Sequence, residues 1–217
     1  MTPEAITTTL HHLAEPRYRD FAASLIPGET DLLGVRLPIL RKLAKQAARS
    51  HWQQLFDALS QEHAMELVML RGMLPGYTTT ATLEERLSAL AAFIPAIRNW
   101  SICDSCCTTY RFVRDNREAV LAFLQPYLIS PQEYEARFAV VMLLLHYVPE
   151  AAWAHRVAEL LPQVTCAAHY ARMAVAWCCC ELYLQQPAIA SDLLPRLSPE
   201  VQALTHRKIR ESHRCPL

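Results

Sequence analysis

Apolar residues recur along this chain at the spacing of an α-helix. The segment Leu83–Phe93 places its large apolar residues on one stripe, which predicts an amphipathic helix with a single buried face. The segment Tyr170–Tyr183 is apolar almost all the way round, which predicts a helix that lies deep between neighbours. The uninterrupted apolar run Phe138–Leu145, which no other run exceeds in length, is far shorter than a membrane-spanning helix requires.

Glycine and proline divide the chain into pieces of helix length. No glycine follows Gly76, and because the turns of a sheet protein need glycine, this distribution favours an all-α fold. Ser130-Pro131-Gln132-Glu133 is typical of an N-cap, a first-turn proline and a capping box, and predicts a helix that runs to about Tyr147. Ser198-Pro199-Glu200 opens the last helix in a similar way.

About ten short helices in antiparallel pairs predict a curved solenoid, or superhelix, of HEAT-like repeats of about 40 residues each. The length fits one large domain, and we expect residues 1–217 to form a single α-helical repeat domain. Because the sequence contains no clear repeat, an irregular α-helical bundle is the alternative fold.

Composition is consistent with this fold prediction, because hydrophobic residues make up 52% of the chain, and the formal net charge of zero indicates no particular partner. Any nucleic-acid contact must therefore come from a local cluster of basic residues. One cluster lies between residues 36 and 49, where no acidic residue intervenes, and a second lies near the C-terminus. They comprise Arg36, Arg41, Lys42, Lys45 and Arg49, and then Arg207, Lys208, Arg210 and Arg214. Such stripes can follow DNA phosphates, although a solvated helix face is the common alternative.

The eight cysteines are unevenly spaced and form a poor disulfide framework. Since the N-terminus also lacks the pattern of an export signal, we expect a reducing compartment and interpret the thiols as small buried residues. A redox pair usually follows a strand, but no strand is predicted before Cys103-x-x-Cys106. A zinc site would need two further ligands at suitable spacing, and none is obvious. We expect neither a metal site nor a cofactor.

Trp100 and Asp104 are the first candidates for chemistry. The segment Asn99–Cys107 should begin a helix, and a spacing of four residues puts both side chains on one face. An aromatic ring attracts a cationic substrate ring, and a carboxylate beside it stabilises positive charge or orients water. The structural alternative is a core tryptophan beside a helix N-terminal aspartate, and spacing alone favours this alternative.

Arg137 and Trp177 are further candidates. Arg137 precedes a strongly apolar stretch, so it must pair with a carboxylate or face a cleft, and a structural ion pair is an equally good interpretation. Trp177 is flanked by small residues in Met173-Ala174-Val175-Ala176-Trp177, which permits close helix packing or a cavity beside the ring.

Several strings together resemble the AlkD-like family of DNA alkylation repair proteins, over most of the chain. They are Leu25-Ile26-Pro27-Gly28 with Leu32-Leu33-Gly34-Val35-Arg36, Phe93-Ile94-Pro95 with Asn99-Trp100-Ser101-Ile102-Cys103-Asp104-Ser105, Arg137-Phe138-Ala139-Val140-Val141-Met142-Leu143-Leu144, Arg172-Met173-Ala174-Val175-Ala176-Trp177 and Lys208-Ile209-Arg210-Glu211-Ser212. Each string is weak alone, and the combination is specific.

The resemblance implies a curved stack of HEAT-like repeats whose concave face holds duplex DNA. It also implies excision of positively charged N3- or N7-alkylated purines, an electrostatic task because the base already carries a charge. By motif, the catalytic aspartate falls on Asp104, its aromatic partners on Trp100 and Trp177, and a phosphate-binding arginine on Arg137. We expect DNA contacts from the basic residues Arg36, Arg41, Lys45, Arg172, Lys208 and Arg210. The implied protein is a monomer of the bacterial cytoplasm or nucleoid.

One departure leaves alternatives open. Well-studied members carry an arginine about one turn after the second tryptophan, where this sequence has Cys180. Some relatives keep the fold without glycosylase activity and bind unusual DNA structures, so a non-catalytic binder of branched or damaged DNA is a second hypothesis. A protein-binding helical scaffold is the third.

Overall fold

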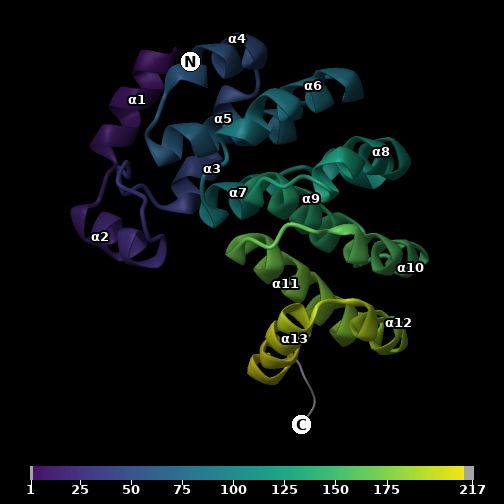
Figure 1. Cartoon of the computed structure of the whole chain (residues 1–217). Helices are drawn as coiled ribbons and strands as arrows, with labels where there is room; N and C mark the ends of the chain where they lie inside the picture. Colours follow the sequence, from purple (N-terminus) through teal and green to yellow (C-terminus); the bar gives the residue numbers. More distant parts are fainter. Residues whose placement is uncertain (1, 213–217) are drawn as a thin grey trace. The chain divides into compact units, whose positions relative to one another are not determined.

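The described residues, 2–212 of the computed structural model, form thirteen α-helices and no strand (Figure 1). This result confirms the predicted all-α class. Short 3-10 turns follow several of the helices. The helices are α1 (Pro3–His12), α2 (Pro16–Leu25), α3 (Leu37–Ala47), α4 (Trp52–Ala58), α5 (Met65–Tyr77), α6 (Leu83–Phe93), α7 (Trp100–Cys107), α8 (Arg117–Leu128), α9 (Glu133–His146), α10 (Ala151–Leu160), α11 (His169–Gln185), α12 (Pro187–Leu193) and α13 (Pro199–Glu211).

The chain divides into two compact units, each with its own core. Unit 1 comprises Met1–Phe112 and contains α1 to α7, and unit 2 comprises Val113–Leu217 and contains α8 to α13. The prediction of a single domain, and that of a curved superhelix, stay predictions.

Helix pairs in unit 1 follow the pattern of a helical repeat. α5 and α6 run antiparallel, because the Arg71 guanidinium near the middle of α5 reaches the Ala92 carbonyl, and Arg86 early in α6 donates to the carbonyl of Pro75. α5 and α7 run parallel, since the Asn99 amide at the start of α7 contacts the Met65 sulfur at the start of α5. Antiparallel pairs with parallel neighbours are what stacked helical repeats produce.

Unit 2 repeats this arrangement. α8 and α9 run antiparallel, because Tyr147 after α9 donates to the Arg117 carbonyl at the start of α8, with 2.8 Å between oxygens. α9 and α11 run parallel, since Glu133 and Tyr170, which lie in their first turns, are joined by a hydrogen bond. α11 packs against α9, α12 and α13, as predicted for a helix that is apolar on nearly every side.

The predicted helix boundaries were mostly confirmed, with one error. α6 has the bounds that its apolar stripe predicts, and Ser198 caps α13 by accepting a hydrogen bond from the Val201 backbone N–H. The prediction for Ser130 was wrong, because α9 begins at Glu133 with Gln132 at its N-cap. The Ser130 hydroxyl accepts from the Gln132 backbone N–H and donates to Glu135, so it forms a local turn before the helix.

Two glycines permit close approach between elements of unit 1. A Cβ atom at Gly72 would lie 2.2 Å from the Phe93 ring of α6, and one at Gly76 would lie 2.3 Å from the Thr109 hydroxyl. α5 therefore contacts both α6 and the turn after α7 through its bare backbone.

The described cysteines are all buried, as predicted, and none of the seven forms a disulfide bond. Cys215 lies outside the described residues. Burial raises the pKa of Cys106 well above its ordinary value and raises that of Cys179 to about 12. Within residues 2–212 there is no group of three or more potential metal ligands, and no helix there is long and apolar enough to span a membrane.

Candidate functional site

α7 carries the central candidates, and hydrogen bonds fix its first turn. Asn99 is the N-cap, and its side-chain oxygen accepts from the Ile102 backbone N–H at 2.9 Å. The Asn99 amide donates to Glu29, at 2.6 Å, and the Arg98 guanidinium pairs with the same carboxylate. Glu29 lies in the loop of residues 26–36, so this loop and the start of α7 are held together.

One face of α7 presents Trp100 and Asp104, and the C-cap residue Thr108 continues it, at intervals of four residues or about 6 Å each along the axis. Trp100 is partly exposed, and its indole N–H donates to the Leu25 carbonyl at 3.3 Å. Asp104 is also partly exposed. As the fifth residue of α7 it lies beyond the first turn. Neither side chain is fully buried, and the choice between a functional pair and the structural alternative, a core tryptophan beside a helix N-terminal aspartate, stays a prediction.

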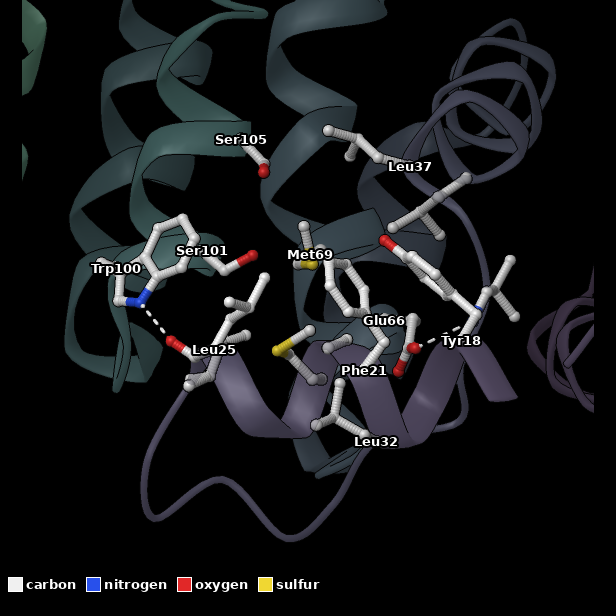
Figure 2. Close-up of a pocket in the computed structure, with 15 residues that line it drawn as sticks. Tyr18, Phe21, Leu25, Leu32, Leu37, Glu66, Met69, Trp100, Ser101 and Ser105 are labelled. Atoms are coloured by element: carbon white, nitrogen blue, oxygen red, sulfur yellow. Dashed lines mark hydrogen bonds between the residues drawn. The ribbon is translucent and has the colours of Figure 1, made fainter. Parts of the chain in front are cut away.

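An apolar pocket of about 220 Å³ lies between α2 and α7. Figure 2 shows Trp100 of α7 and Tyr18 of α2 on opposite sides of it. Phe21 and Leu25, both on α2, are 59% and 50% exposed although they are large and apolar. The Ser101 and Ser105 hydroxyls complete the α7 side of the wall. Trp100 thus belongs to an accessible aromatic surface, which the sequence analysis did not identify because Tyr18 and Phe21 stand in no motif.

The loop that connects this surface to the core is held by a buried carboxylate. Glu66 of α5 is 2% exposed and accepts hydrogen bonds from the backbone N–H groups of three consecutive residues, Leu33, Gly34 and Val35. Gly34 has φ +95°, and a Cβ atom there would lie 2.7 Å from the Glu15 carbonyl oxygen. The motif residues Leu32–Arg36 therefore have a structural role, because their backbone attaches the loop to Glu66 of α5. An acidic residue inside the apolar run of α5 was the available signal for Glu66.

Two of the predicted DNA contacts, Arg41 and Lys45, lie together near the C-terminal end of α7. They line a pocket with Tyr77, Thr108 and Arg111, and the Arg41 guanidinium donates to the Thr108 hydroxyl at 2.9 Å. Arg111 was not among the predicted residues, because it lies outside both basic clusters of the sequence.

The remaining predicted DNA contacts have varied surroundings. Arg36 forms a bidentate ion pair with Glu15, at 2.8 and 2.9 Å, and lies over the Tyr18 ring. In unit 2, Arg172 and Lys208 are partly buried and Arg210 is exposed. Arg172 has a buried Nε atom without a hydrogen-bond partner. Arg214 lies outside the described residues.

Arg137 and Trp177 lie on neighbouring helices of unit 2. Arg137 of α9 is 6% exposed, and its guanidinium donates to the Tyr170 carbonyl at 2.9 Å. Glu133, one turn earlier, accepts from the Tyr170 backbone N–H at 2.6 Å. These two α9 side chains therefore fix the first turn of α11. Trp177 of α11 is partly exposed, whereas Cys180, in place of the family arginine, is buried.

The structure thus brings Trp100 and Asp104 together in unit 1 and puts Arg137 and Trp177 on adjacent helices of unit 2. The convergence of all four in one groove stays a prediction.

Comparison with known proteins agrees with the resemblance found in the sequence. The model of a family described as DNA alkylation repair enzyme matches residues 6–186, a range that includes Trp100, Trp177, Asp104 and Arg137. Searches of curated proteins and of solved structures gave no match. Since the family model covers most of the chain and extends into both units, this chain belongs to the DNA alkylation repair enzyme family.

Proposed function

We propose that this protein is a DNA glycosylase that hydrolyses the N-glycosidic bond of cationic N3- or N7-alkylated purines in duplex DNA. Family membership supports DNA as the partner. The observation that carries the proposal is the face of α7, where a partly exposed carboxylate, Asp104, follows a partly exposed indole, Trp100, by one turn.

This pair suits the chemistry of a charged leaving group. An alkylated purine already carries the positive charge that a neutral base would need to acquire by protonation, so a neutral purine leaves when the glycosidic bond breaks. The sugar then develops oxocarbenium character. A carboxylate at that point stabilises the developing cation and orients the attacking water, which supplies the hydroxyl group at C1′ and loses its other proton to the carboxylate or to solvent. Asp104 would have this role.

Trp100 would bind the cationic nucleotide through its ring face. Its indole N–H is held by the Leu25 carbonyl, and Leu25 is at the end of α2. The ring is therefore oriented before the substrate arrives, and its binding costs less conformational entropy.

The test is release of 3-methyladenine or 7-methylguanine from methylated duplex DNA. We expect the wild type to release the base and Asp104→Asn to lose about 10²- to 10³-fold in rate, as when one preorganised electrostatic group is removed. Binding of the duplex should be unchanged. Asp57→Asn is the matched control, because Asp57 is an exposed aspartate on α4 outside this site.

The outcomes separate the hypotheses. A wild type that releases no base at any salt concentration would remove the glycosylase proposal. If it still binds branched or damaged DNA with a steep salt dependence, the non-catalytic binder takes its place. If charge reversal at Arg41, Lys45 or Arg210 leaves the cellular function intact, a protein-binding scaffold is favoured.

A further inference from the structure

Three basic side chains gather in unit 1 without a carboxylate. The pocket near the C-terminal end of α7, about 430 Å³ in volume, is lined by Arg41 and Lys45 of α3, by Arg111, and by Gly76, Tyr77, Thr108 and Thr109. We call this set the basic pocket. No acidic residue lines it. Three like charges repel one another, so their proximity indicates a site for an anion.

The basic pocket differs in this respect from six other arginines of the chain. Arg19, Arg36, Arg98, Arg117, Arg156 and Arg207 each pair with a carboxylate. Among the described residues, Arg41, Lys45 and Arg111 form no such ion pair. Their charge is therefore available to a ligand that is not part of unit 1.

The walls of the basic pocket position these cations. The Arg41 guanidinium donates to the Thr108 hydroxyl, which in turn donates to the Ser105 carbonyl at 2.8 Å. The Lys45 ammonium lies over the Tyr77 ring, 5.3 Å from its centroid. Gly76 lets the turn after α7 pack directly on α5, because any Cβ atom there would overlap Thr109. Arg41 and Lys45 thus reach the surface in fixed orientations, which lowers the entropy lost on binding.

We propose that the basic pocket binds a phosphodiester group of the DNA backbone beside the alkylated nucleotide. This inference rests on the proposed function for the identity of the ligand. Thr108 follows Asp104 by one turn of α7, or about 6 Å along the axis. The bound phosphate would therefore lie close to the nucleotide that faces Asp104, and it would set the register of the strand.

Salt dependence of binding tests this assignment. The affinity for a short, unmodified, fluorescein-labelled duplex is measured by fluorescence anisotropy across a series of sodium chloride concentrations. Each lost phosphate contact should reduce the slope of log K against log salt by about 0.9. We expect this reduction for Lys45→Gln and for Arg111→Gln. Both side chains are exposed, so the variants should keep the wild-type melting temperature.

Lys42→Gln is the matched control. It removes the same charge from the same helix, but Lys42 is exposed and does not line the basic pocket. A slope that falls as much for Lys42→Gln as for Lys45→Gln would show a diffuse basic surface and overturn the proposal. Unchanged slopes for Lys45→Gln and Arg111→Gln would overturn it as well.

A second arm distinguishes DNA from a small phosphorylated ligand. The melting temperature is measured with inorganic phosphate and with sodium chloride at matched ionic strength. Stabilisation by phosphate that is lost in Arg111→Gln, together with unchanged DNA slopes, would assign the basic pocket to a free phosphate compound and overturn the DNA assignment. Because these measurements use unmodified DNA, a wild type without base release would refute only the glycosylase proposal.

Discussion

Replacing Glu66 by glutamine should loosen the loop of residues 26–36, because this carboxylate accepts three backbone N–H groups. One of its oxygens accepts from Gly34 and Val35, at 2.7 and 3.1 Å, and the other accepts from Leu33 at 3.0 Å. A glutamine keeps one oxygen and turns an amide N–H₂ toward the remaining donor. At best, the amide oxygen retains Gly34 and Val35 and leaves the Leu33 N–H without an acceptor.

The size of this effect follows from the number of bonds. A buried donor left unsatisfied costs about 1–3 kcal/mol, and each bond to a charged acceptor exceeds a neutral one by about 1 kcal/mol. A neutral amide is less costly to bury than a carboxylate, which offsets part of the loss. We therefore expect Glu66→Gln to lower the free energy of unfolding of unit 1 by about 2–4 kcal/mol.

Hydrogen exchange and urea denaturation together provide the assay. The peptide that contains residues 33–35 should exchange at least about 30-fold faster, since each 1.4 kcal/mol corresponds to a factor of ten. The control is Glu159→Gln, at an exposed position of α10 in unit 2. A Glu66→Gln protein within about 0.5 kcal/mol of the wild type, with unchanged exchange at residues 33–35, would refute the reasoning.

Two further predictions concern packing and thiol reactivity. Gly72→Ala should destabilise unit 1 by about 1–3 kcal/mol despite the higher helix propensity of alanine, because its Cβ atom would overlap the buried Phe93 ring. In urea denaturation the loss should shrink when combined with Phe93→Leu, and strictly additive effects would contradict the overlap. The seven described cysteines should resist alkylation of the native protein at pH 8. Burial raises the pKa of Cys106 and Cys179, so the thiolate is scarce well below the raised pKa. Modification of any of them in the folded state, found by peptide mass spectrometry, would show that these sites open to solvent.

Local patterns predicted the helices because the apolar residues on the buried face of a helix recur at a fixed spacing in the sequence. Leu83–Phe93 and the cap at Ser198 are examples, since periodicity and a capping residue are both contained in one short segment. The pattern at Ser130 predicted the wrong helix start because a serine before a proline can cap a helix or form a local turn, and the choice depends on a contact with Glu135.

The site was predicted only where a helix itself brings residues together. Trp100 and Asp104 share a face of α7 by their spacing, so the sequence could relate them. The contacts that hold α7 join segments far apart in the chain: Asn99 with Glu29, and Glu66 with the loop around Gly34. The spacing of apolar residues within one helix cannot predict such long-range contacts. Arg111 is also far from Arg41 and Lys45 in the sequence, and only the packing of the turn after α7 brings it into their pocket.

Placement of Trp100 and Asp104 on one short helix, with Thr108 at its C-cap, restricts how this surface can change in evolution. One residue inserted between Trp100 and Asp104 would rotate the carboxylate by about 100° about the axis of α7 and turn it away from the indole. Relatives can therefore vary this surface by exchanging side chains, whereas insertions and deletions should be confined to the segments on either side of α7.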